Sequence, residues 1–307
     1  MSSTDSRRPL HSTEYINPAR SYWWNADFLA LMGQRWKLSQ VRRALDVGCG
    51  VGHWSAIVGG LLNPAASLIG VDREPAWAAA FRAVAAQSPL GPRRSVLVAG
   101  AEALPFPSAS FDFVTCQTLL IHVADARVVL REMMRVLAPG GLLAVVEPSN
   151  RVQALLGAAS RTGDSVETLV ERTRFVLRCE RGRAQLGEGR FSLGDELPEL
   201  LVEQGLTDVR LFQSDKPRSL IPPYTGPEQQ AFTASLRESG PLDAWLWRRD
   251  DARRYHLAGG GDEAEFATQW ARLEAEQEEA RMAARANTHA HAGGQLLYLA
   301  SGRKRLD

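Results

Sequence analysis

The sequence predicts an α/β fold, in which a mostly parallel sheet carries helices on both faces, together with a helical cap. Two observations predict this arrangement. Short runs of β-branched and other apolar residues alternate with helical stretches between residues 43 and 146, a pattern typical of parallel strands joined by right-handed crossovers. A later stretch of roughly 80 residues separates the last two expected strands, which is longer than an ordinary loop and favours a cap. With 307 residues, the chain is long enough for both parts.

The expected elements follow in order along the chain. Before the alternation begins, aromatic and apolar side chains recur at helical spacing over 21–36, which predicts an amphipathic helix. Strands are then expected over 43–47, 67–71, 95–98, 111–116 and 142–146, and helices over 53–62, 75–87 and 125–137. Asp125 can cap the third of these helices, and Pro139-Gly140-Gly141 is expected to terminate it.

After residue 150 the pattern changes. Helices are expected over 165–186, 193–204 and 262–287, and strands over 208–213 and 295–301. The segment between these two strands contains enough large apolar side chains to pack as a cap: Trp245, Trp247, Tyr255, Phe266 and Trp270. We therefore divide the chain into an N-terminal helical cap segment over 1–40, a core over 41–216 and 293–307, and a helical cap insertion over 217–292.

The composition argues against several classes of protein. The formal net charge is +1, which disfavours nucleic acid or an anionic membrane as the main partner. The three cysteines are odd in number and widely spaced, so they fit neither a disulfide framework nor a zinc site, and no metal site is expected. No apolar run approaches the roughly 20 residues that span a bilayer, and the polar N-terminus lacks the pattern of a secretory signal. We expect a cytoplasmic protein.

Gly48, Gly50 and Gly52 form a G-x-G-x-G turn between a strand and a helix. A dinucleotide-binding loop would require glycine at His53, and a phosphate-binding loop would require Gly-Lys-Ser/Thr, so both patterns are excluded. A glycine turn at the carboxyl end of a strand lets a ligand lie against bare backbone, with helix N-terminal amides available to a carboxylate. The other interpretation is a turn that binds nothing.

Asp72 ends the next apolar strand of the chain. An acidic side chain at this position can accept hydrogen bonds from both hydroxyls of a ribose; its other interpretation is a cap for the helix that begins at Pro75. A glycine turn, a ribose carboxylate and the lack of a pyrophosphate pattern together indicate a mononucleoside with a small charged arm. S-adenosylmethionine fits that description.

Five motifs carry a resemblance to a known family. In order, they read LDVGCGVG, GVDRE, AEALPFPSASFDFVTC, LLIHVADARVVLREMMRVLAPGG and LLAVVEPSN, and they cover about 44–150. This part of the chain resembles the class I S-adenosylmethionine-dependent methyltransferases of the type 11 group, most of all the small-molecule branch related to ubiquinone and menaquinone methyltransferases. The resemblance implies a Rossmann-like sheet of seven strands, the last of them antiparallel.

The resemblance also implies the cofactor site. Four residues are expected to line the methionine arm: Asp46, Gly48, Gly50 and Gly52. Asp46 would reach the ammonium, directly or through water. Asp72 would hold the ribose, and the side chain of Arg73 would cover the adenine edge.

The chain departs from the family pattern at the adenine end of this site. The family reads Gly-Asp-Ala-Glu before Leu-Pro-Phe, whereas this chain reads Ala99-Gly100-Ala101-Glu102. Gly100 therefore stands where the family has its adenine-binding Asp. We expect a backbone amide near Ala101 and the side chain of Glu102 to make part of the adenine contact instead. Gln117, the first residue past the fourth strand, is expected either to face the methionine moiety and the acceptor or to cap a turn.

Methyl transfer from a sulfonium is an in-line displacement, which requires positioning and exclusion of water but requires a base only when the acceptor keeps a proton. Two residues are catalytic candidates: His122, whose other interpretation is a packing residue, and Glu147, whose other interpretation is a helix or turn partner. Four residues are candidate substrate contacts: Tyr15, Tyr22, Trp23 and Arg178. The aromatic residues could instead pack, and Arg178 could instead lie on a solvated helix face.

The sequence therefore favours an S-adenosylmethionine-dependent methyltransferase that acts on a small organic acceptor, in specialised metabolism. The alternatives are a non-catalytic methyltransferase-like scaffold or regulatory subunit, and a methyltransferase that acts on a peptide or protein. Nucleic acid and membrane are not expected as partners, and a homodimer is compatible with the sequence.

Overall fold

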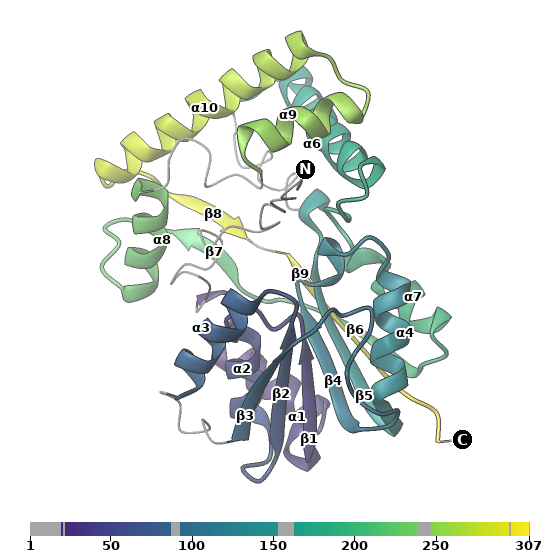
Figure 1. The fold of residues 1–307 in the computed structure, drawn as a ribbon. Helices are drawn as coiled ribbons and strands as arrows, with labels where there is room; N and C mark the ends of the chain where they lie inside the picture. The colour runs from purple at the N-terminus through teal and green to yellow at the C-terminus, as the bar shows by residue number, and fades with distance from the viewer. Residues whose placement is uncertain are drawn as a thin grey trace, which may run out of the picture.

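The computed structural model describes residues 20, 22–86, 93–152, 163–238, 247–294 and 296–306. Its centre is a seven-stranded sheet with the strand order β3-β2-β1-β4-β5-β9-β6 (Figure 1). The strands of this sheet are β1 (Arg43–Val47), β2 (Ser67–Asp72), β3 (Arg94–Val98), β4 (Phe111–Gln117), β5 (Leu137–Pro148), β6 (Thr207–Gln213) and β9 (Leu297–Arg303).

The first five strands of the sheet are parallel, and β9 pairs in antiparallel fashion with both β5 and β6. The expected fold class, a mostly parallel sheet whose last strand is antiparallel, is confirmed. Because β1 lies at the point where the strand order reverses, its carboxyl end opens into the crevice where sheets of this kind bind ligands.

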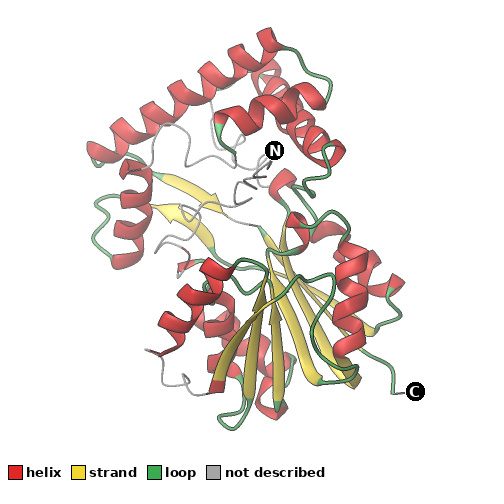
Figure 2. Cartoon of the chain, viewed as in Figure 1, coloured by secondary structure: helices red, strands yellow, loops and turns green. Residues whose placement is uncertain are grey.

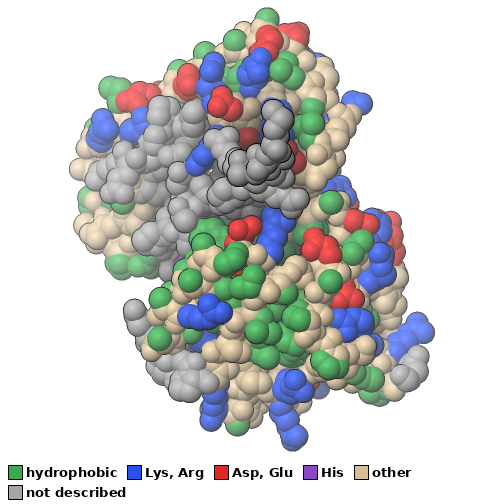
Figure 3. Space-filling view, in the orientation of Figure 1, with side chains coloured by type: hydrophobic (Ala, Val, Ile, Leu, Met, Phe, Trp, Pro, Cys, Tyr) green, Lys and Arg blue, Asp and Glu red, His purple; other side chains and the backbone are tan. Residues whose placement is uncertain are grey.

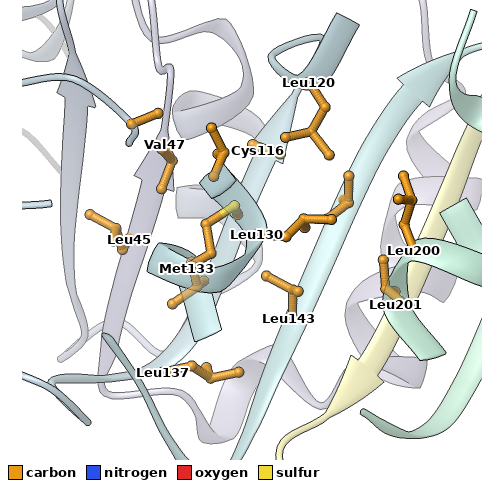
Figure 4. Close-up of a cluster of buried hydrophobic side chains, with 14 of the residues drawn as sticks. Leu45, Val47, Cys116, Leu120, Leu130, Met133, Leu137, Leu143, Leu200 and Leu201 are labelled. Carbon is orange, nitrogen blue, oxygen red and sulfur yellow. The ribbon is translucent and has the colours of Figure 1, made fainter. Parts of the chain in front are cut away.

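Helices cover both faces of the sheet (Figure 2). Within the described ranges they are α1 (Ala26–Arg35) and α2 (His53–Leu61) on one face, α4 (Ala126–Val136) and α7 (Leu197–Glu203) on the other, and α3 (Pro75–Ala86) beside β3. Successive strand residues point to opposite faces, so Ala44 packs in the cluster of α1 and α2, whereas Leu45 packs in the cluster of α4 and α7. Figure 4 shows the second cluster, with Leu130 and Met133 of α4 against the sheet.

A helical lobe lies beyond the end of the sheet at which the parallel strands finish (Figure 1). It consists of α6 (Val166–Gln185), α9 (Arg249–Ala258) and α10 (Glu263–Arg285). Its core is the apolar cluster Phe175, Val176, Cys179, Phe191, Trp247, Ala252, Tyr255, Phe266 and Trp270. Gly182 lies against the backbone carbonyl of Tyr255, and Gly259 against that of Arg178, so α6 and α9 cross with their backbones in close approach. The lobe thus includes α6, which precedes the 217–292 segment.

Between the lobe and the sheet lie α8 (Pro227–Glu238) and a small ladder of β7 (Pro217–Leu220) with β8 (His291–Gly294) (Figure 1). The 217–292 segment is therefore not wholly helical. Three short elements were not expected from the sequence, namely α8, α9 and the β7–β8 ladder. Within the described ranges, no helix combines the length and the apolar character that a membrane span requires.

Candidate functional site

The glycine turn after β1 consists of three left-handed residues. The φ angles are +68° at Gly48, +53° at Gly50 and +92° at Gly52, a region that favours glycine. A Cβ placed on Gly48 would lie 2.6 Å from Leu119 Cδ1, and one on Gly52 would lie 2.7 Å from Phe81 Cδ2, whereas one on Gly50 would have nothing within 4 Å. The outer two glycines thus allow close packing, and the middle one leaves bare backbone beside open space.

Asp72 connects the end of β2 to this turn. Its Oδ2 accepts a hydrogen bond from the Gly50 amide at 2.9 Å, and its Oδ1 accepts one from the Glu74 amide at 2.9 Å. Each carboxylate oxygen keeps a further lone pair, so the side chain can still accept two ribose hydroxyls. The two interpretations of Asp72, as a partner of the backbone and as a ribose ligand, are therefore compatible.

Asp46 lies beneath the turn and is only 1% exposed. Its Oδ2 accepts a hydrogen bond from Ser55 Oγ of α2, and its Oδ1 has no hydrogen-bond partner among the described residues. Burial raises the pKa of Asp46 to about 7. A buried carboxylate oxygen without a partner is unfavourable by itself, so this position suits the ammonium of an amino acid, and the site fits the methionine arm.

The loop after β3 forms the expected adenine end of the site. The Ala99 amide donates to the Asp72 carbonyl at 3.0 Å, which holds this loop next to β2. A Cβ placed on Gly100 would lie 3.0 Å from Glu102 Oε2. The Glu102 carboxylate therefore lies where an Asp side chain at position 100 would begin. Arg73 lies nearby in the chain and pairs with Glu74 at 3.7 Å.

Gln117 and Glu147 end the neighbouring strands β4 and β5. Gln117 is 8% exposed, and its Nε2 has no hydrogen-bond partner among the described residues. Glu147 is fully buried, and its Oε1 accepts hydrogen bonds from the Leu119 amide at 2.8 Å and the Leu120 amide at 2.6 Å. Burial raises the pKa of Glu147 to about 8. These contacts favour Glu147 as the residue that holds the loop after β4, and its catalytic role stays a prediction.

His122 closes the same loop against α6. Arg183 Nη2 lies 3.2 Å from His122 Nδ1, and it also donates to the Ile121 carbonyl at 3.2 Å. An arginine only donates hydrogen bonds, so His122 Nδ1 accepts, and the neutral ring then carries its hydrogen on Nε2. This arrangement favours the packing interpretation of His122, and its role as a base stays a prediction.

The three candidate substrate contacts that the structure describes pack against different elements. Tyr22 packs edge-on against Phe232 of α8, with ring centroids 6.3 Å apart. Trp23 packs against the cluster of α1 and α2. Arg178 forms an ion pair with Glu265 of α10, within the lobe, and Tyr15 lies outside the described residues.

Two residues near the turn were missed by the sequence reasoning. Ser55 donates to Asp46, and its place three residues after the last glycine of the turn was the only signal in the sequence. Arg20 reaches Thr118 at the end of β4, where Arg20 Nη2 lies 3.4 Å from Thr118 Oγ1. No sequence motif links Arg20 with Thr118, because almost a hundred positions separate them.

Comparison with known proteins agrees with this geometry. Residues 45–145 match the family model described as a methyltransferase domain. The chain is 34% identical over 122 residues to the ubiquinone/menaquinone biosynthesis C-methyltransferase UbiE of Geobacter sulfurreducens, a match that covers 37% of this chain and 48% of that protein. It is 33% identical over 126 residues to a demethylmenaquinone methyltransferase of Listeria monocytogenes, covering 41% of this chain and 51% of that protein. The chain thus spans about half the length of these curated relatives.

Solved structures agree on the fold. The YcgJ protein of Bacillus subtilis superposes with a TM-score of 0.52 at 20% identity, covering 92% of this chain and 99% of that one. The cyclase SpnF superposes with a TM-score of 0.51 at 20% identity, covering 92% of this chain and 82% of that one. At these identities the likeness concerns the fold alone. The family match therefore identifies residues 45–145 as a methyltransferase domain, on a fold that these solved structures share.

Proposed function

We propose that the chain is an S-adenosylmethionine-dependent methyltransferase that transfers a methyl group by in-line displacement to a small organic acceptor. The observation that carries this proposal is the glycine turn itself. The bare backbone of Gly50 borders open space and is tied by a hydrogen bond to the carboxylate of Asp72. This arrangement provides a place for a nucleoside whose ribose and amino-acid arm lie on either side of the turn.

The residues of the site contact different parts of the cofactor. Asp46 takes the ammonium and Asp72 the ribose hydroxyls, while the backbone of Gly48, Gly50 and Gly52 borders the methionine arm. Glu102 replaces the missing Asp at position 100 and accepts a hydrogen bond from the adenine amine, beside the backbone of Ala101. Arg73 covers the adenine edge, and Gln117 faces the methionine moiety. Bound S-adenosylmethionine supplies an electrophilic methyl group on a sulfonium.

The acceptor is proposed to need little help from a base. Nδ1 of His122 is occupied by Arg183, and burial favours the neutral acid form of Glu147, which already holds the loop after β4. An electron-rich carbon or a neutral amine can attack a sulfonium methyl without losing a proton first. The two curated relatives are named for methylation in quinone biosynthesis, so a phenolic or quinol-like ring carbon is the first acceptor class to test.

Three further features belong to this proposal. The helical lobe covers the acceptor, and Tyr22 and Trp23 remain candidate substrate contacts. The location is cytoplasmic, because Cys49, Cys116 and Cys179 are all buried free thiols. The acceptor is a small molecule in specialised metabolism rather than a nucleic acid, in keeping with the mixed charges on the face in Figure 3. A homodimer stays a prediction that light scattering would measure.

The test is methylation of a panel of acceptors, with the product detected by mass. The panel contains hydroxylated aromatic rings, quinols, small amines and a mixture of peptides, each incubated with the chain and S-adenosylmethionine. We expect one added methyl group on a small aromatic acceptor. Methylation of peptides alone would support the peptide alternative, and cofactor binding without any product would support the scaffold.

A further inference from the structure

The guanidinium of Arg20 lies beside the end of β4 and acts electrostatically on His53, the residue that follows the glycine turn. Its Nη2 lies 3.4 Å from Thr118 Oγ1, and its Cζ lies 4.5 Å from the centre of the Trp23 ring. Leu119, the residue after Thr118, is the side chain that packs against Gly48. His53 directly follows the turn, and its pKa is lowered by burial and, to a smaller extent, by the charge of Arg20. The contact with Thr118 and the effect on His53 thus place this cation near the methionine end of the site.

Arg20 has no carboxylate partner in the part of the chain that the structure describes. Burial lowers the pKa of Arg20 to about 10, and no acidic side chain opposes this effect. Arg73, by contrast, pairs with Glu74. Removing a guanidinium from water without pairing it is unfavourable, so an anion that enters this position gains a desolvated partner.

The residue that holds Arg20 has an unusual backbone. Thr118 has a φ of +52°, which is rare for a β-branched residue and typical of functional positions. Its amide donates to the Val146 carbonyl at 2.8 Å, and its hydroxyl donates to the Gln117 carbonyl at 2.7 Å. Because the hydroxyl hydrogen is used in this way, the remaining lone pairs of Oγ1 are free to accept from Arg20. The loop therefore fixes the direction of the guanidinium.

We propose that Arg20 is a positioning residue that binds the carboxylate of the amino-acid arm of the cofactor. The proposal rests on the proposed function and deepens it. The arm carries two charges, and the site then offers one partner for each: Asp46 for the ammonium and Arg20 for the carboxylate. An arginine can hold a carboxylate through two parallel hydrogen bonds, which would fix the arm and hence the direction of the sulfonium methyl.

The experiment is calorimetric titration with two ligands that differ only in the carboxylate. One is S-adenosylhomocysteine, and the other is its decarboxylated analogue, which keeps the amine and the adenosine. The variants are Arg20→Ala, Arg20→Lys and, as a matched control, Arg35→Ala, which loses an arginine stacked 4.9 Å from the Phe212 ring. Thermal unfolding of each variant accompanies the titrations.

Arg20→Ala is expected to weaken S-adenosylhomocysteine binding by about 10- to 100-fold, as loss of a charged hydrogen-bond partner does, and to leave the decarboxylated analogue within about twofold of its original affinity. Arg20→Lys should recover part of the loss, and Arg35→Ala should change neither affinity. The proposal would be overturned if Arg20→Ala weakened the binding of both ligands equally, or weakened the binding of neither. Unchanged binding of both ligands together with a raised KM for the acceptor would assign Arg20 to the acceptor instead. If the unaltered chain binds neither ligand, the proposed function itself fails.

Discussion

Asp46 and Asp72 lie close to the same glycine turn, but their surroundings give them different chemistry. Asp46 is buried with one unpartnered oxygen, and its pKa is raised to about 7. Below that pH the folded chain without cofactor holds a neutral carboxyl, which must lose its proton to pair with an ammonium. We therefore expect S-adenosylhomocysteine binding to release a proton near pH 6 and to release much less near pH 8.5. Calorimetry in buffers of different ionisation enthalpy measures this release.

The control for this prediction is Asp46→Asn, which should release no proton at either pH. The same raised pKa has a consequence for stability: the neutral form is favoured by folding, so the contribution of Asp46 is fully present below its unfolded pKa of about 4 and is lost as the pH rises through about 7. Proton release that is independent of pH, or unchanged in the Asn variant, would contradict the assignment of Asp46 to the ammonium.

Asp72 has a matched counterpart at the other end of the sheet. Asp72 accepts from the amides of Gly50 and Glu74, and Asp112 accepts from those of Arg42 and Arg43 at 2.7 and 3.0 Å. Asp72→Ala and Asp112→Ala should therefore each destabilise the fold by about 1–3 kcal/mol. Only Asp72→Ala should weaken S-adenosylhomocysteine binding, by about 10-fold or more. Equal affinities of the two variants in a titration would remove Asp72 from the ribose site.

Glu102 lies next to the position at which the sequence departs from the family pattern, Gly100. The sequence shows that the usual adenine-binding Asp is absent, and the structure brings the Glu102 carboxylate next to Gly100. By contrast, no pattern predicts that Arg178 pairs with Glu265 or that Arg20 reaches Thr118. The turn and Asp72 are predictable because local spacing determines them, whereas these contacts depend on how distant segments pack.

At the level of elements, the loop after β4 depends on Glu147. Its buried carboxyl accepts two loop amides and has a pKa raised to about 8. Folding favours the neutral form, so the stability it contributes is present below its unfolded pKa of about 4.5 and is lost as the pH rises through about 8. Glu147→Gln keeps the acceptor oxygen and cannot ionise. We expect the melting temperature of the original chain to fall relative to Glu147→Gln between about pH 5 and pH 9.

Glu147→Ala is the contrasting variant, since it leaves two amides without an acceptor and should destabilise the fold at every pH, by about 2–5 kcal/mol. If the melting temperatures of Glu147→Gln and of the original chain changed equally with pH across this range, the carboxyl would not titrate as its burial requires.

Most elements of the core could be predicted, because each strand and helix carries its own periodicity. The main difference is β5, which begins at Leu137 and so contains the Pro139-Gly140-Gly141 stretch that was expected only to terminate α4. The reason is a distant partner: the Gly140 amide donates to the Lys304 carbonyl at 2.9 Å, and the Lys304 amide donates to the Gly141 carbonyl at 3.0 Å. Pairing near the chain terminus thus extends a strand through residues that favour a turn.

For the whole molecule, the question is how the helical lobe relates to the core. Gly182 is a point of close approach between α6 and α9, against the carbonyl of Tyr255. Gly182→Val should separate these helices and open the lobe to proteolysis within 166–285, while S-adenosylhomocysteine affinity stays within about twofold because the turn lies elsewhere. Gly226→Ala is the control, since nothing lies within 4 Å of its added Cβ. Loss of cofactor binding in Gly182→Val would show that the lobe and the core fold as one unit.

The fold alone does not identify the reaction, because one of the solved structures that shares it is named as a cyclase. The sequence predicts the class of fold and the cofactor turn, since both depend on the spacing of residues close together in the chain. It does not predict what the lobe encloses, since that surface is assembled from α6, α9 and α10 across more than a hundred residues. The assignment of the cofactor site therefore depends first on the glycine turn.

The most direct test of the account is a titration of S-adenosylhomocysteine into Gly50→Ala and Gly205→Ala beside the unaltered chain. Both glycines have a positive φ, +53° and +76°, and neither has an atom within 4 Å of an added Cβ, so both substitutions should cost about 1 kcal/mol of stability. We predict that the unaltered chain and Gly205→Ala bind with similar micromolar affinity and that Gly50→Ala binds at least about 10-fold more weakly. Equal binding by all three would contradict the assignment of the turn, and so would no binding by the unaltered chain.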